Sequence, residues 1–209
     1  MQTGLADVLK ISPVIPVLVI ESVEDAVPLA QALSDGGLKV LEVTLRTEAA
    51  LASIKAMRDA CPDLIIGAGT ILTAEHYRLA VEAGSQFIVS PGCCEQLLAA
   101  AAQYDVPFLP GASTLSEMMA LYNVGYQVLK FFPAELNGGA PFLKTVSAVM
   151  PQLTFCPTGG ISTANAGDYL SLPNVACIGG SWMASAKSIS AKDWSTISQQ
   201  SEEAAALLA

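Results

Sequence analysis

The feature that constrains the fold most is a repeated order of short apolar segments and amphipathic segments, which fills the chain after residue 13. The apolar segments are short and rich in β-branched residues, as strands are, and each is followed by a turn and a helical pattern. They predict eight strands: Val14–Ile20, Lys39–Leu45, Leu64–Gly69, Gln86–Ser90, Pro107–Pro110, Val128–Phe132, Thr154–Pro157 and Val175–Gly179. Strands that alternate with helices form parallel sheets with right-handed crossovers. Eight units in 209 residues therefore predict an α/β fold, a single (β/α)8 TIM barrel.

The rest of the chain fits one domain over residues 1–209, since this length is enough for one large core. Gly4–Ile11 is amphipathic and predicts a short N-terminal helix that fills the N-terminal mouth of the barrel. An open, doubly wound sheet is the alternative fold, but it normally has fewer strands and a glycine-rich fingerprint after the first. Capping boxes predict several helix starts, at Ser22 with Asp25, Thr114 with Glu117, and Ser190 with Asp193.

Composition excludes several functional classes. The chain is 52% hydrophobic and 14% charged, which is apolar for a soluble monomer and favours a buried subunit interface. A net charge of -9 leaves no basic patch for a nucleic acid. No apolar run reaches the ~18 residues of a membrane span, and the N-terminus lacks the pattern of a signal peptide. Five cysteines without a CxxC pair fit a reducing cytosol, so we expect a cytoplasmic protein.

Nothing in the sequence predicts a metal or another cofactor. The one histidine, His76, lies in a helical pattern and is expected at the surface, so a histidine-rich metal site is excluded. Gly67–Gly69 begins like a dinucleotide-binding fingerprint, but Leu72 occupies the position of the third glycine. We therefore expect chemistry that uses the side chains of the protein itself.

Lys130 is the most unusual residue of the predicted strands, because two large apolar residues flank it on each side. Lysine is almost never fully buried without a partner or a task. Side chains alternate along a strand, so Val128, Lys130 and Phe132 share one face. Apolar surroundings favour the neutral amine that forms Schiff bases. A buried ion pair without chemistry is an equally open interpretation at this point.

The predicted strand Lys39–Leu45 carries a matching carboxylate. Alternation directs Glu42 into the barrel and places Arg46 at the upper rim of the same face. Beside Lys130, Glu42 would accept and return protons or would form a static ion pair. Apolar burial and an ionised Glu42 act on the protonation of Lys130 in opposite directions, and the sequence does not decide between them. Arg46 is placed either to clamp a carboxylate or to form an exposed salt bridge.

Nearly every predicted strand ends in glycine, proline, serine, threonine or a charged residue, and barrels carry their chemistry at these C-terminal ends. Thr70 follows the third strand, and Pro91 follows the fourth. Thr158–Ser162 (TGGIS) and Gly179–Ser181 (GGS) follow the last two strands, where barrel enzymes commonly bind phosphate through backbone N–H groups. One Gly-Gly pair also fits a plain tight turn, whereas the two together favour a phosphate site.

With these pieces placed, the sequence resembles the class I 2-dehydro-3-deoxy-6-phosphogluconate (KDPG) aldolases, of the KDPG/4-hydroxy-2-oxoglutarate aldolase family, over nearly its whole length. The motifs that carry the resemblance are LEVTLRT (Leu41–Thr47), GAGT (Gly67–Thr70), SPG (Ser90–Gly92), PGAST (Pro110–Thr114), KFFPAE (Lys130–Glu135), FCPTGGIS (Phe155–Ser162) and CIGGSW (Cys177–Trp182). As a group these motifs are highly specific.

The resemblance implies a role for each site residue. Lys130 would be the Schiff-base lysine and Glu42 the general acid/base. The other predicted site residues are Arg46 and Thr70 for the pyruvate carboxylate, Pro91 and Phe132 for the pocket wall, Thr158 for the substrate hydroxyls, and Gly159, Gly160, Gly180 and Ser181 for the phosphate.

The resemblance further implies the reaction: reversible cleavage of KDPG, a phosphorylated keto acid of the Entner–Doudoroff pathway, to pyruvate and glyceraldehyde 3-phosphate. The family is typically homotrimeric, metal-free and cytoplasmic. Aldolases for the galactonate epimer or for 4-hydroxy-2-oxoglutarate are the alternatives with the same chemistry, and the choice between epimers depends mainly on Thr158. An epimerase-like phosphosugar barrel is disfavoured by the single histidine. A barrel that only binds a phosphorylated ligand would leave Lys130 and Glu42 without a purpose.

Overall fold

The structure is a computed structural model that describes residues 4–208. Its strands alternate with helices along the chain, and every strand pairing is parallel. The strands are β1 (Val14–Leu18), β2 (Val40–Thr44), β3 (Ile65–Gly69), β4 (Ile88–Val89), β5 (Phe108–Leu109), β6 (Gly111–Ala112), β7 (Val128–Phe131), β8 (Thr154–Pro157) and β9 (Ile178–Gly180). The predicted α/β class with a parallel sheet is therefore confirmed.

The strands pair in two sheets, a six-stranded one in the order β5-β4-β3-β2-β1-β9 and a three-stranded one in the order β6-β7-β8. The chain passes from one sheet to the other at Pro110, between β5 and β6. On the other side, two isolated parallel bridges, Phe155 to Val175 and Thr158 to Gly179, join β8 to the segment around β9. The sheets together form a curled parallel layer, but their ladders are not continuous as the prediction of one barrel sheet required.

Pro110 lies where β5 ends and β6 begins, at the end of the predicted fifth strand. We expected this strand to end at Pro110, whereas the chain remains extended through β6 and changes its partner from β4 to β7. A proline has no N–H group and cannot donate to a ladder, so an interruption at this residue is expected. The carbonyl of Pro110 is used nevertheless, because it accepts a hydrogen bond of 2.9 Å from the backbone N–H of Lys130. The break thus lies directly beside the lysine of β7.

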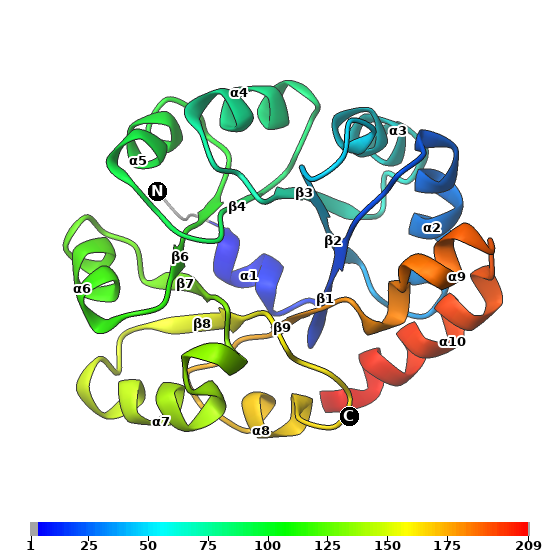
Figure 1. The fold of residues 1–209 in the computed structure, drawn as a ribbon. Helices are drawn as coiled ribbons and strands as arrows, with labels where there is room; N and C mark the ends of the chain where they lie inside the picture. Colours follow the sequence, from blue (N-terminus) through cyan, green and yellow to red (C-terminus); the bar gives the residue numbers. More distant parts are fainter. Residues whose placement is uncertain (1–3, 209) are drawn as a thin grey trace.

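Helices surround the strands on the outside, as the ribbon in Figure 1 shows. The helices are α1 (Leu5–Leu9), α2 (Val23–Asp35), α3 (Ala50–Ala60), α4 (Ala74–Glu82), α5 (Glu95–Ala101), α6 (Leu115–Asn123), α7 (Gly139–Val149), α8 (Ala166–Leu170), α9 (Ala186–Ser190) and α10 (Trp194–Ala205), with the 3-10 turns η1 (Glu135–Asn137), η2 (Trp182–Ala184) and η3 (Ala206–Leu208). The first helix differs from the rest, because in Figure 1 it lies inside the ring of strands.

The apolar core has two parts. The larger part lies between the strands and the outer helices, and the smaller part lies inside the curled sheet. The inner part contains Leu5 and Leu9 of α1 together with Val40 and Val128 from the inward faces of β2 and β7. Both leucines are fully buried. The prediction that the N-terminal helix fills the N-terminal mouth, here called the lower end of the sheet, is confirmed. The inward direction of Val40 and Val128 is confirmed as well.

The helix starts follow the sequence only in part. At α6 the predicted capping box is present, since Thr114 and Glu117 bond to each other's backbone N–H groups. At α2 the side chain of Ser22 makes no capping hydrogen bond. The prediction of a box at Ser190 was wrong, because Asp193 is itself the N-cap of α10 and accepts a hydrogen bond from the N–H of Thr196. Whether a side chain caps its helix depends on backbone angles that the spacing of residue types in the sequence does not determine.

Candidate active site

A cavity of about 250 Å³ opens at the C-terminal ends of the strands. Seven of the eleven predicted site residues line it, together with Val17 and Thr44, which we did not single out. The nine lining residues are Val17, Glu42, Thr44, Arg46, Thr70, Pro91, Lys130, Phe132 and Thr158. They come from the ends of β1, β2, β3, β4, β7 and β8 or from the residues that follow, so the cavity lies where chemistry belongs in folds of this kind.

Lys130 and Glu42 meet at the floor of this cavity. The Nζ atom of Lys130 lies 3.1 Å from Oε1 and 3.4 Å from Oε2 of Glu42. The two residues are only 5% and 3% exposed. Burying two charged groups costs several kcal/mol per ion, and attraction within a pair recovers this cost only when the geometry is good. A buried amine in contact with a carboxylate places a nucleophile and a proton carrier within hydrogen-bond distance of each other.

Phe132 and Gly69 define the space around the pair. The Nζ atom of Lys130 lies 5.6 Å from the centroid of the Phe132 ring, within the range of a cation–π contact. Gly69 ends β3 directly beside Glu42, and a β-carbon at this position would overlap the Glu42 carboxylate. The glycine of the GAGT motif is therefore required by close approach. Thr70, the next residue, has a positive φ of 59°, a conformation that a β-branched residue rarely adopts and that clusters at functional sites.

Arg46 is held at the rim by its neighbour on the same face of β2. Its Nε donates to Oγ1 of Thr44 at 3.0 Å, and that hydroxyl donates to the carbonyl of Leu18 at 2.7 Å. Thr44 is buried, whereas Arg46 is exposed. Among residues 4–208 Arg46 forms no ion pair. The interpretation as an exposed salt bridge was therefore wrong, and the guanidinium remains available for an anionic ligand.

Thr44 and Val17 show what the sequence argument passed over. Alternation places Thr44 between Glu42 and Arg46 on the inward face, so the pattern contained this signal. Its task, however, depends on the carbonyl of Leu18 in the neighbouring strand, and only the paired structure reveals that contact. Val17 pairs in register with Glu42 across β1 and β2, which brings an apolar wall to the carboxylate.

The four residues predicted for a phosphate lie beside the cavity and do not line it. Gly159 and Gly160 follow β8 with φ values of 102° and 77°, which non-glycine residues avoid. Gly180 ends β9 and Ser181 follows it, exposed. Thr158 connects this region to the cavity, because it lines the cavity and bridges to Gly179. Its buried Oγ1 has no hydrogen-bond partner within the described part of the chain.

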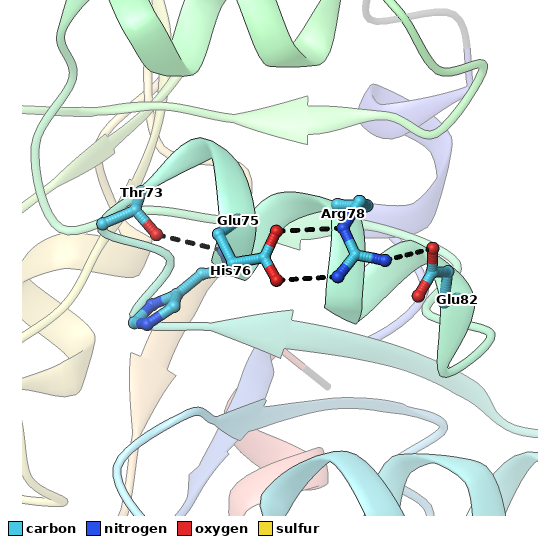
Figure 2. Close-up of polar contacts among 5 residues, drawn as sticks. All are labelled: Thr73, Glu75, His76, Arg78 and Glu82. Carbon is cyan, nitrogen blue, oxygen red and sulfur yellow. Dashed lines mark hydrogen bonds and ion pairs between the residues drawn. The ribbon is translucent and has the colours of Figure 1, made fainter.

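The polar side chains of α4 lie outside this site. Figure 2 shows Thr73 at the start of α4 and Arg78 held between two carboxylates. Arg78 contacts Glu75 at 2.7 Å and Glu82 at 2.5 Å, so this arginine is already paired. His76 is half-buried, not fully at the surface as expected, and its Nδ1 lacks a partner within residues 4–208. The described residues include no group of three histidine, cysteine or acidic side chains that would hold a metal ion.

In the part of the chain that the structure describes, no helix has the length and apolar character needed to cross a membrane.

The fold and the cavity define a class: a parallel α/β protein with a buried lysine–carboxylate pair at its strand ends. The family model "KDPG and KHG aldolase" matches residues 5–200. The chain belongs to this family.

Relatives and solved structures agree with this assignment. The KHG/KDPG aldolase of Escherichia coli K12 is 47% identical over 203 residues, which are 97% of this chain and 95% of that protein. The KDPG aldolase of Legionella pneumophila, solved with pyruvate captured as a covalent carbinolamine intermediate, has a TM-score of 0.94 and 46% identity over 96% of this chain and 98% of that one. The 2-keto-3-deoxy-6-phosphogluconate aldolase of Zymomonas mobilis ZM4, solved with 3-phosphoglycerate, has a TM-score of 0.94 and 43% identity over 99% and 97% of the two chains.

Proposed function

We propose that this protein is a class I aldolase that cleaves KDPG reversibly to pyruvate and glyceraldehyde 3-phosphate, and that it also cleaves 4-hydroxy-2-oxoglutarate. The observation that carries the proposal is the buried pair, in which the Nζ of Lys130 lies 3.1 Å from Glu42 at the floor of the cavity. Family membership and the pyruvate adduct of the Legionella aldolase support it.

In the proposed reaction Lys130 is the nucleophile. Its amine attacks the C2 ketone and gives a carbinolamine, which loses water to form an iminium ion. The iminium withdraws electrons from the neighbouring carbon, so cleavage of the C3–C4 bond places its electron pair in an enamine. The backbone N–H of Lys130 is bonded to Pro110, and its side chain lies between Glu42 and Phe132. These contacts hold the amine in place for attack.

Glu42 is the proton carrier in this scheme. For attack, the amine transfers its proton to the carboxylate that it touches. Glu42 returns this proton to the carbinolamine hydroxyl, which leaves as water, and is then a carboxylate again. Directly or through a water molecule, it next removes the proton of the C4 hydroxyl while the C3–C4 bond breaks, which releases the aldehyde. A proton delivered to C3 converts the enamine to the iminium of pyruvate, and hydrolysis frees both pyruvate and Lys130. One carboxylate thus serves successive steps, as general acid/base catalysis requires.

Arg46 and Thr70 are proposed to hold the pyruvate carboxylate. A guanidinium binds a carboxylate through two parallel hydrogen bonds, and the Nε bond to Thr44 fixes its orientation. Pro91 and Phe132 would form the apolar wall around the pyruvate methyl group. The carboxylate and the methyl group of pyruvate would thus be held by different parts of the cavity lining.

The backbone around Gly159, Gly160, Gly180 and Ser181 is proposed to bind the phosphate. Backbone N–H groups bind an oxyanion without a net positive charge, which suits a chain with a net charge of -9. Thr158 lies between the two subsites, and its Oγ1 is buried without a partner within the described chain. We propose that it contacts the substrate hydroxyls and favours the gluconate epimer. An aldolase for the galactonate epimer is the alternative.

We also propose that residues 1–209 form one closed (β/α)8 barrel domain, with the break at Pro110 and the bridges beside β9 as its two joints. A cytoplasmic homotrimer is proposed from the family. Exposed apolar side chains on or beside α6 support an interface, since Leu115, Met119 and Val124 are 41%, 55% and 58% exposed. Val124 also lines a groove of about 300 Å³ between α5 and α6.

Trapping with borohydride tests the mechanism. The protein is incubated with pyruvate and reduced, and the adduct is located by intact mass and peptide mapping. A stable pyruvate adduct on Lys130, absent from Lys130→Ala, is the expected result. Lys55→Ala, on the outer helix α3, is the matched control and should be labelled as the wild type is. If no adduct forms under conditions that trap a known Schiff-base aldolase, the mechanism is wrong and binding without turnover becomes the better account.

A further inference from the structure

The segment after β7 is bonded to the loop that we propose for the phosphate. The N–H of Ala134 donates to the carbonyl of Thr158 at 2.8 Å, and the N–H of Glu135 donates to that of Gly159 at 3.1 Å. The strand that carries Lys130 and the Gly159–Gly160 loop are therefore linked through two consecutive backbone hydrogen bonds. Glu135 itself does not line the Lys130 cavity.

The side chain of Glu135 lies against Gly160. A β-carbon built on Gly160 would lie 2.7 Å from both Cβ and Cγ of Glu135, so the two residues are in close contact. The carboxylate of Glu135 accepts a hydrogen bond from the hydroxyl of Tyr169, in α8. Tyr169 is 1% exposed. Gly139 packs beside this hydrogen bond. A β-carbon built on Gly139 would lie 3.2 Å from Oε1 of Glu135 and 3.3 Å from the hydroxyl oxygen of Tyr169.

The presence of a carboxylate at this place requires an explanation. Glu135 is exposed, but a negative charge next to a phosphate site opposes binding of the phosphate even where water screens part of the repulsion. Glu135 has no ion-pair partner among residues 4–208, so no cation offsets its charge there. Its hydrogen bond leads to Tyr169 in the helix layer, and both side chains border a separate groove of about 320 Å³ that shares no residue with the Lys130 cavity.

We propose that Tyr169 is a positioning residue for phosphate recognition. Its hydroxyl holds the Glu135 carboxylate on the helix side of the Gly159–Gly160 loop, away from the face that receives the phosphate, while the Glu135 backbone supports the loop. This inference rests on the proposed function, because it assumes that the loop binds the phosphate of KDPG.

Two substrates and three variants test it. KDPG carries a phosphate and 4-hydroxy-2-oxoglutarate does not, so an effect on the loop changes KM for the first substrate alone. Tyr169→Phe releases the carboxylate and should raise KM for KDPG about tenfold, with kcat within about twofold. Glu135→Gln keeps an oxygen that accepts the tyrosine hydrogen bond but removes the charge, so its KM should equal or fall below that of the wild type. The double variant Tyr169→Phe/Glu135→Gln should recover most of the lost affinity.

Tyr77→Phe is the matched control. Tyr77 is also fully buried, and its hydroxyl donates to the carbonyl of Val106 at 3.2 Å, far along the chain from the loop. The variant Tyr77→Phe also loses the hydrogen bond of one buried tyrosine hydroxyl, but its KM for KDPG should not change. If Tyr169→Phe does not fold, Glu135→Gln alone decides: a rise in its KM for KDPG contradicts the proposal.

Equal KM changes for both substrates, or a double variant no better than Tyr169→Phe, would show that Tyr169 acts through general stability and would overturn the inference. A wild type that forms the pyruvate adduct but does not cleave KDPG would overturn the proposed function instead. The two failures are therefore separable.

Discussion

The residues at the lower, N-terminal ends of the strands and those at the upper, C-terminal ends have different roles. Val128 and Lys130 are separated by one residue of β7 and point to the same side, yet Val128 packs against α1 while Lys130 pairs with Glu42. At the lower end, side chains are apolar and fill the space. At the upper end, the strands finish around a cavity of about 250 Å³. Burial is common to both ends, so the position along the strand decides whether a buried residue stabilises the fold or carries chemistry.

The energetics of the two ends differ in the same way. Each fully buried leucine of α1 stabilises the folded chain by roughly 1.5–3 kcal/mol of apolar burial. A buried ion pair is often no more stabilising than apolar residues of the same volume. The lower end therefore offsets part of the cost of the pair at the upper end. Substitutions at one end should change activity, and substitutions at the other should change stability.

Glu42→Gln should produce the largest effect and should be confined to the upper end. Removal of a positioned general acid/base lowers kcat by about 10²–10⁴-fold. The amide keeps the volume of the carboxylate, which Gly69 and Val17 enclose. Steady-state kinetics with KDPG measures the loss, and the rate of borohydride trapping with pyruvate should fall as well, because Glu42 accepts the proton that the Lys130 amine loses before attack. Wild-type kcat in this variant would remove Glu42 from the mechanism.

Leu9→Ala should produce the opposite result. Leu9 is fully buried in the apolar cluster inside the sheet. Its truncation therefore leaves a cavity and lowers the free energy of unfolding by roughly 2–5 kcal/mol. Denaturant unfolding measures this change, and kcat of the folded variant should remain within about twofold of the wild type. Ile11→Ala is the control, because Ile11 is 48% exposed and its truncation should cost little. A large fall in kcat would show that the two ends are coupled.

Glu117→Ala, in the outer helix layer, should have the smallest effect and should depend on pH. Hydrogen bonds from the N–H groups of Ser113 and Thr114 lower the pKa of Glu117 below its usual value. A lowered folded pKa adds stability above the unfolded pKa of about 4.3 and loses it as the pH falls through the folded value. At neutral pH the variant should lose about 1 kcal/mol of the free energy of unfolding. Thermal melts from neutral to acid pH should show the gap to wild type closing below about pH 4; a constant gap would contradict this account.

The sequence predicted the elements that depend on local pattern. Alternation along two strands was enough to place Glu42 and Lys130 on inward faces, where the curled sheets bring them to 3.1 Å from each other. The position of Leu5 and Leu9 inside the lower end of the sheet was also predictable from the sequence, because an amphipathic helix packs its apolar face against an apolar surface.

Features that depend on partners far along the chain were missed. The role of Thr44 as support for Arg46 depends on the carbonyl of Leu18, 26 residues away. The division of the fifth strand depends on which neighbour each half meets, not on Pro110 alone. The contact between Glu135 and Tyr169 joins residues 34 apart. Such contacts arise from tertiary packing, which overrides local preference.

The helix α1 also limits the route to the cavity in the proposed reaction. Because Leu5 and Leu9 fill the inside of the sheet at its N-terminal end, substrate and products would reach and leave Lys130 at the C-terminal ends of the strands. In the proposed reaction pyruvate would be attached covalently to Lys130, whereas the aldehyde is free once the C3–C4 bond breaks. The aldehyde would therefore depart first, and pyruvate only after hydrolysis. A helix of five residues thus restricts exchange with the cavity to the opposite end of the sheet.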